Sequence, residues 1–77
     1  MQDLLSMLVR SLVDDPEAVK INEVSAGSTH ILEVDVAEAD RGKVIGRGGS
    51  TAEALRTILK AAGGRDGKRY VLEIVEG

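Results

Sequence analysis

The sequence of 77 residues has room for one small domain, and it contains no Cys, Trp or Phe. These absences exclude disulfides, thiolate metal sites and thiol nucleophiles, and Tyr70 remains the only aromatic side chain on which a nucleic-acid base could stack. No apolar run approaches the ~18 residues of a membrane span, and no charged-then-apolar leader begins the sequence. We therefore expect a soluble, cytoplasmic protein without a membrane partner.

The net charge of −3 conceals an uneven distribution of charge along the chain. Residues 1–40 carry two basic side chains against nine acidic ones, whereas residues 41–69 carry eight basic side chains against two acidic ones. Opposite signs in the two stretches predict one basic working surface on an otherwise acidic body. From charge alone, a solvated surface with unevenly placed charges explains the pattern equally well.

A first helix is expected over residues 2–13, because apolar residues recur there at helical spacing. Its apolar stripe consists of Leu4, Leu8 and Leu12, widened by Leu5 and Val9. The helix should end at Asp14-Asp15-Pro16, since proline disfavours a helical residue before it. A short turn that starts at Pro16, with Asp15 as its cap, is expected next.

Two strands joined by a tight turn are predicted over residues 19–25 and 29–36. In the second strand His30, Leu32, Val34 and Val36 alternate with Ile31, Glu33 and Asp35. Gly27-Ser28 suits a two-residue hairpin turn, because glycine accepts the positive φ that such turns require. A short helix within 37–45 and a glycine loop at 46–49 should follow.

A further helix is predicted over residues 50–62. Its apolar side consists of Ala52, Leu55, Ile58, Leu59 and Ala62. Ser50 and Glu53 have the spacing of a capping box, which marks the start of this helix. Gly63-Gly64 should end it, and Asp66-Gly67 should turn the chain into a last strand over 68–75.

The order of the predicted elements is α-β-β-α-α-β, which indicates the α+β class. Strands joined by a tight hairpin run antiparallel, whereas strands joined through a helical crossover run parallel. We therefore expect a three-stranded mixed sheet with the helices packed on one face.

The stretch Val44-Ile45-Gly46-Arg47-Gly48-Gly49 carries the most chemical information. Its glycines let a phosphate approach the backbone, and the free N–H groups of the next helix add partial positive charge. Arg47 at the tip and Lys43 one turn earlier can reach phosphate oxygens. An apolar floor for bases could be formed by Ile45, Ala52 and Leu55. A dinucleotide-binding Gly-x-Gly-x-x-Gly motif is excluded because Thr51 occupies its last position, but a bend that merely requires glycine remains an alternative.

The residues around this loop resemble the signature of a KH domain, in which such a loop clamps four backbone nucleotides. The signature comprises Gly42-Lys43-Val44-Ile45-Gly46-Arg47-Gly48-Gly49 followed by Ala52-x-x-Leu55-Arg56-Thr57. The order of elements resembles the type II arrangement of this domain. Further matching segments extend the resemblance, over essentially the whole chain, to the single-KH RNA-binding proteins of bacteria. It implies one KH domain over residues 1–77, with its core motif at about 29–75.

The resemblance also implies single-stranded RNA held in a groove between the two central helices and the adjacent strand. The residues that it places at or beside this site are Lys43, Ile45, Gly46, Arg47, Gly48, Gly49, Ser50, Ala52, Leu55 and Arg56. Relatives often carry basic residues where this chain has Ser50 and Glu53, and KH domains often have Ile where it has Ala52. These departures predict weaker or shallower RNA contacts.

The same resemblance implies a post-transcriptional regulator or RNA chaperone in a system linked to cell elongation, without a cofactor or metal. It further implies a homodimer, a heterodimer with a larger KH-containing protein, or both. The alternative to a primary role in RNA binding is an interaction module that acts mainly through such pairing and binds RNA weakly by itself.

No enzymatic activity is expected, because the chain has no Cys and one His, and no nucleophile–base pair is identifiable. His30 is interpreted as a structural histidine on a strand. Four acidic residues lie close together in the sequence, and they are Glu33, Asp35, Glu38 and Asp40. This acidic group could in principle hold a divalent cation, but a solvated surface is the preferred interpretation.

Overall fold

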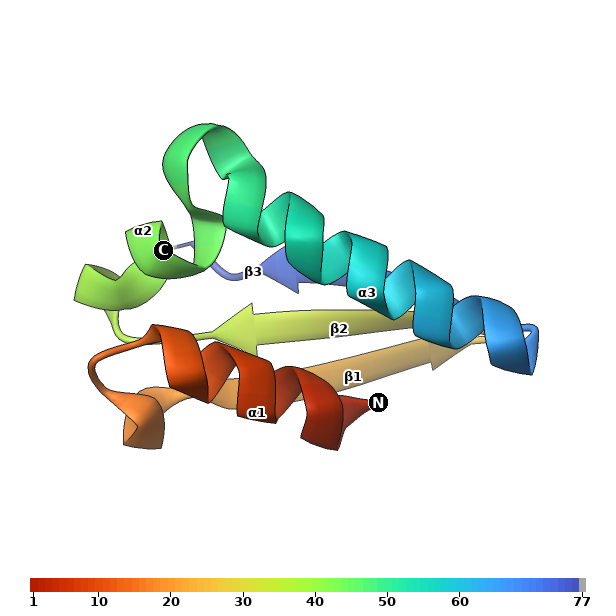
Figure 1. Ribbon diagram of the computed structural model, residues 1–77. Helices are drawn as coiled ribbons and strands as arrows, with labels where there is room; N and C mark the ends of the chain where they lie inside the picture. The colour runs from red at the N-terminus through yellow and green to blue at the C-terminus, as the bar shows by residue number, and fades with distance from the viewer. Residues whose placement is uncertain (77) are drawn as a thin grey trace.

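Three α-helices and a three-stranded sheet make up the protein, whose structure is a computed structural model that describes residues 1–76. The helices are α1 (Gln2–Leu12), α2 (Arg41–Ile45) and α3 (Ser50–Asp66), and the strands are β1 (Lys20–Ala26), β2 (Thr29–Asp35) and β3 (Arg69–Ile74). Short 3-10 turns precede β1, α2 and α3, and they are η1 (Pro16–Ala18), η2 (Glu38–Asp40) and η3 (Arg47–Gly49). Figure 1 shows α1 and α3 on the same face of the sheet, with α2 at one end. The predicted α+β class and the order α-β-β-α-α-β are confirmed.

The sheet has the strand order β1-β2-β3, so β2 lies in its centre. β1 and β2 are antiparallel, from Lys20 opposite Asp35 to Ala26 opposite Thr29, and β2 and β3 are parallel. Gly27 has a φ of 61° in the two-residue turn between β1 and β2, as the hairpin prediction requires. The mixed sheet is therefore confirmed, because a hairpin produces its antiparallel pair and the crossover through α2 and α3 produces its parallel pair.

The hydrophobic core lies between the sheet and the helices. The alternation of side chains along β2 directs Leu32 and Val34 into this core, and both are fully buried. The other members of the core cluster are Leu5, Val9, Val19, Val36, Val44, Leu55, Leu59 and Leu72. Full burial of a Leu or Val side chain contributes roughly 1.5–3 kcal/mol, so this cluster is what holds α1 and α3 on one face of the sheet.

Each long helix buries a narrower stripe than its sequence predicts. In α1, Leu5 and Val9 are fully buried, whereas Leu12 of the predicted stripe is exposed. In α3, Leu59 is buried but Ile58 is 41% exposed. The predicted stripes were too wide because helical spacing identifies the apolar side of a helix, whereas only the part of that side that contacts the sheet is covered.

The helix α3 continues through Gly63 and Gly64 to Asp66, so the helix end predicted at the glycine pair is wrong. Gly67 ends the helix instead, with a φ of 68°. A Cβ atom at Gly63 would lie 2.6 Å from the Lys68 carbonyl oxygen and 2.7 Å from Cδ2 of Tyr70. Gly63 therefore permits close packing of α3 on the chain that enters β3, and it does not terminate the helix.

Candidate nucleic-acid interface

The glycine loop Gly46–Gly49 joins α2 to α3 through three positive φ angles: 78° at Gly46, 62° at Gly48 and 80° at Gly49. With a ψ of 170°, Gly46 occupies a region that is essentially open to glycine alone. A Cβ atom at Gly46 would also lie 2.7 Å from the backbone nitrogen of Thr51, whereas at Gly48 or Gly49 it would meet nothing within 4 Å. Gly46 therefore shapes the turn, and the other two glycines leave open space beside the backbone.

The helix α3 starts at Ser50 without a side-chain cap. Its N-cap residue is Gly49, and within residues 1–76 no side-chain cap is formed there. The predicted capping box is wrong, because Ser50 is already the first helical residue and Glu53 accepts a hydrogen bond from Arg56 at 3.2 Å instead. N–H groups in the first turn of a helix have no intrahelical acceptor and carry partial positive charge. The N–H of Ser50 donates to the carbonyl oxygen of Arg47, so it is the N–H groups after Ser50 that make this end of α3 suited to an anion.

A groove of about 520 Å³ lies between α3 and β3. It is lined by Arg56, Lys60, Gly64, Lys68, Arg69, Tyr70, Val71 and Leu72. Arg56, Lys60 and Gly64 recur at every fourth position and so share one side of α3. Four of the eight lining residues are cationic, although the protein as a whole is acidic. The groove is therefore a local concentration of positive charge, although one of its four cations, Arg56, is paired with Glu53 at 3.2 Å.

Of this lining, only Arg56 was among the site residues predicted from the sequence. The spacing of four residues between Arg56 and Lys60 is a local signal from which Lys60 could have been found. Lys68 and Arg69 are different, because their position beside α3 depends on how β3 pairs with β2. The sequence predicts that these two strands are parallel, but it does not give the register that places Lys68 and Arg69 beside α3.

The predicted apolar floor is only partly available to a ligand. Ala52 and Leu55 are buried, and Ile45 is half-buried. Arg47 and Ser50, in contrast, are exposed at the loop and at the start of α3. Ala52 and Leu55 therefore support the helix from within the protein, and Ile45 is the member of the predicted floor that retains accessible surface.

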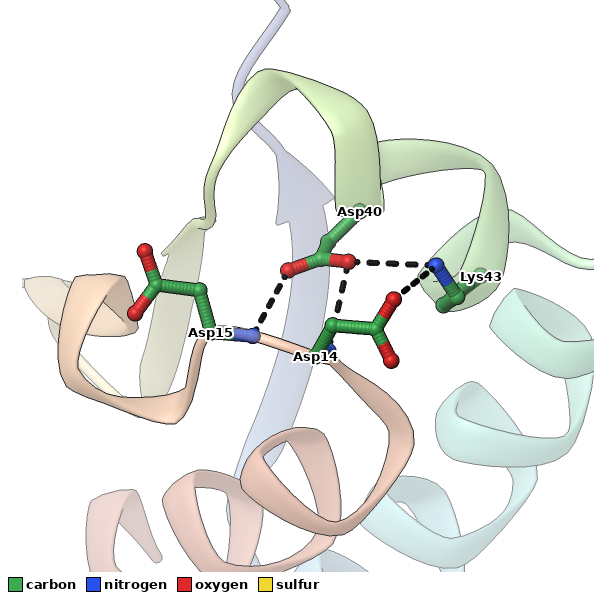
Figure 2. A network of polar contacts seen from close by, with 4 residues as sticks. All are labelled: Asp14, Asp15, Asp40 and Lys43. Carbon is green, nitrogen blue, oxygen red and sulfur yellow. Dashed lines mark hydrogen bonds and ion pairs between the residues drawn. The ribbon is translucent and has the colours of Figure 1, made fainter.

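Asp40 is a buried carboxylate at the junction of η2 and α2, with 2% of its surface exposed. It accepts hydrogen bonds from the backbone N–H groups of Asp14 at 3.2 Å and Asp15 at 3.1 Å (Figure 2). Burial raises the pKa of Asp40, but these two bonds and Lys43 outweigh that effect and hold the pKa below its ordinary value. The interpretation of Asp40 as a solvated carboxylate is therefore wrong. The sequence could not reveal its burial, because the contact with Asp15 joins segments that lie 25 residues apart.

Lys43, which the sequence places among the RNA contacts, is paired with two carboxylates. Its Nζ lies 2.9 Å from Oδ2 of Asp14 and 3.3 Å from Oδ1 of Asp40. The hydrogen bond to Asp14, followed by that to Asp40, raises the pKa of Lys43 above its ordinary value. Asp15 is the expected cap of η1, but within the described chain its side chain forms no cap there.

His30 makes structural contacts inside the sheet. Its Nδ1 lies 2.7 Å from Oε2 of Glu23, and its ring stacks on Tyr70 with 5.1 Å between the ring centroids. The hydrogen bond from His30 is the largest cause that lowers the pKa of Glu23. Across residues 1–76, no group of three or more His, Cys, Asp or Glu side chains is placed to hold a metal ion. No helix in this range is long and apolar enough to span a membrane.

The arrangement of these elements and this loop defines a class of protein. A three-stranded mixed sheet in α-β-β-α-α-β order, with a Gly-x-x-Gly loop between its second and third helices, is the architecture of a type II KH domain. The family model described as "KhpA/KhpB, KH domain" matches residues 2–74. The chain therefore belongs to the KhpA/KhpB family of KH domains.

Several curated relatives are similar to this chain over nearly its full length, and each carries the name "RNA-binding protein KhpA". The relative from Clostridium acetobutylicum is 47% identical over 75 residues, which cover 97% of this chain and 100% of the relative. The relative from Clostridium perfringens is 45% identical with the same coverage. The relative from Aquifex aeolicus is 43% identical over 99% of this chain and 96% of its own length.

Proposed function

We propose that this protein is a non-catalytic, single-stranded RNA-binding protein that acts in the cytoplasm as an RNA chaperone or post-transcriptional regulator. The observation that carries the proposal is the basic groove between α3 and β3, on a helix whose uncapped N-terminus adjoins the glycine loop. An acidic protein that concentrates cations in one groove offers a specific site for a polyanion. Membership of the KhpA/KhpB family, whose relatives carry the name of an RNA-binding protein, supports the same function.

The glycine loop and the groove have different roles in this proposal. Phosphates approach the backbone at Gly48 and Gly49, where no Cβ obstructs them, and Arg47 and the N–H groups of α3 neutralise their charge. The bases lie in the groove, against the aliphatic parts of its cationic side chains. Because the Gly-x-x-Gly loop of a KH domain clamps four backbone nucleotides, we expect a single strand and not an A-form duplex in the groove.

The affinity of the isolated protein should be modest and dependent on salt. If two to three phosphates are neutralised, the logarithm of the association constant should fall with the logarithm of salt concentration at a slope near −2. Titration of a fluorescein-labelled single-stranded RNA at several salt concentrations measures this slope. A slope near zero at undiminished affinity would contradict phosphate contact as the basis of binding.

Charge reversal at the loop, with a matched control, tests the site. Arg47→Glu should abolish RNA binding, because the loop then repels the phosphates that it should hold. Arg10→Glu makes the same change of charge on exposed α1 and should retain most of the affinity. Far-UV circular dichroism checks that both variants are folded. Wild-type affinity in a folded Arg47→Glu variant would exclude the loop as the RNA site.

Oligomerisation is a second part of the proposal, and the family description, which names KhpA and KhpB together, supports it. Met7 of α1 is 62% exposed, and Ile58 of α3 and Val24 of β1 are also exposed. These side chains lie on separate elements, so each adds apolar contact area only where a partner covers it. The partner is a second copy of the chain or KhpB (Jag), the larger KH protein that the family description names beside KhpA. Sedimentation at micromolar concentration, alone and with KhpB, tests this, and an 8 kDa species in both experiments would contradict it.

A further inference from the structure

The ion pair between Asp14 and Lys43 connects the segment after α1 to the helix that precedes the glycine loop. Asp14 contributes an exposed carboxylate, with 82% of its side chain accessible, and the side chain of Lys43 is 44% exposed. Lys43 also contacts Asp40, which is buried (Figure 2). The contact of Lys43 with Asp14 is therefore open to solvent, so another anion can compete for the ammonium group.

The position of the Asp14 carboxylate follows from the buried carboxylate of Asp40. Asp40 accepts hydrogen bonds from the backbone N–H groups of both Asp14 and Asp15, and these bonds fix the path of the chain at the two residues. Figure 2 shows that the Asp14 side chain consequently points toward Lys43, whereas the Asp15 side chain points away from it. Two neighbouring carboxylates with the same backbone anchor thus differ in whether they contact Lys43.

Lys43 lies three residues before Gly46, where the glycine loop begins, and Arg47 lies at the tip of that loop. Within residues 1–76, the ion pairs include Lys43 but not Arg47. Of the two cations that flank Gly46, one is therefore neutralised by the protein's own carboxylates. The positive charge available to a phosphate beside the loop is therefore smaller than the sequence indicates.

We infer that Asp14 lowers the RNA affinity of this protein by occupying Lys43, and that an RNA phosphate replaces the Asp14 carboxylate when RNA binds. This inference rests on the proposed function. A carboxylate and a phosphate are both anionic acceptors for an ammonium group, and an exposed ion pair is weak enough to exchange. Asp14 acts as an intramolecular competitor for Lys43, and Asp40 keeps its contacts throughout.

The test compares two substitutions that remove the same charge from adjacent residues, Asp14→Asn and Asp15→Asn. Both variants retain the backbone N–H groups that donate hydrogen bonds to Asp40. Binding of a fluorescein-labelled single-stranded RNA should be about two- to fivefold tighter for Asp14→Asn than for Asp15→Asn, the range that an exposed ion pair supports. When Lys43→Met is added to each variant, the difference between them should disappear.

Each result discriminates between the inference and the proposed function. Equal affinities of Asp14→Asn and Asp15→Asn overturn the inference while leaving RNA binding intact. A difference that persists with Lys43→Met also overturns it, because the effect of Asp14 then does not act through the lysine. Failure of the wild type and of all folded variants to bind RNA at low salt overturns the proposed function and, with it, the inference. Urea unfolding confirms that every variant is folded under the binding conditions.

Discussion

The two adjacent glycines inside α3 should respond in opposite directions to replacement by alanine. In a helix interior Ala is favoured over Gly by about 0.5–1 kcal/mol, and this gain applies equally at Gly63 and Gly64. A Cβ atom at Gly64 would meet nothing within 4 Å, so Gly64→Ala should stabilise the protein by roughly that amount. At Gly63 the same atom would lie 2.6 Å from the Lys68 carbonyl oxygen and 2.7 Å from the Tyr70 ring. That contact requires the backbone to move.

The size of the effect follows from the cost of overpacking, which is typically about 1–3 kcal/mol. Because the gain in helix propensity is common to both variants, the difference in unfolding free energy between Gly63→Ala and Gly64→Ala isolates this cost. A difference of about 2 kcal/mol corresponds to about 8–16 °C in Tm for a domain of this size.

Urea unfolding followed by far-UV circular dichroism, at one protein concentration, measures both free energies and their m-values. The expected order of stability is Gly64→Ala, then the wild type, then Gly63→Ala. Equal stability of the two variants, or a Gly63→Ala variant more stable than the wild type, would refute the close packing of α3 on the chain that enters β3.

Three further predictions concern the buried carboxylate, the loop and the core. Asp40→Asn should destabilise the protein at neutral pH, but the difference in stability from the wild type should shrink as the pH falls below about 4, because a carboxyl whose pKa is lowered in the folded state stabilises only while it is ionised. Urea unfolding from pH 7 to pH 2 tests this, and a difference that stays constant would contradict it. In the same assay at pH 7, Gly46→Ala should lower the free energy of unfolding by ~2–3 kcal/mol and Gly48→Ala by ~1 kcal/mol, because only the backbone conformation at Gly46 is restricted to glycine. Equal losses in the two variants would contradict this account of the loop. In thermal unfolding, Leu5→Ala should lower the free energy of unfolding by ~2–5 kcal/mol and Met7→Ala by less than ~0.5 kcal/mol, because Leu5 is fully buried and Met7 is exposed. Similar losses in the two variants would show that α1 does not pack as described.

The features that the sequence predicts correctly are those that depend on local signals. The alternation around Leu32 and Val34 indicates a strand with one buried side, and Gly27 marks the turn that makes its hairpin antiparallel. The glycine loop between two helical segments, together with the residues around it, is sufficient to indicate the KH family. The contacts of RNA with this loop remain predictions.

The errors occur where local signals allow more than one outcome. Gly63-Gly64 is typical of a helix end, but Gly63 also suits a helix interior packed closely against another segment. Ser50 and Glu53 have capping-box spacing, but the positive φ of Gly49 moves the helix boundary one residue earlier. Asp40 has the sequence surroundings of a solvated carboxylate, yet it binds two amides 25 and 26 residues away.

The sequence by itself therefore determines which segments form helices and strands, how the strands pair and where the open loop lies, because periodicity and turn chemistry act over a few residues. The tertiary structure alone decides that Lys43 is paired with Asp14 and Asp40 and that Lys68 and Arg69 share a groove with α3. Those contacts arise only when the sheet brings distant segments together, since charges interact according to their distance in space and not their separation along the chain.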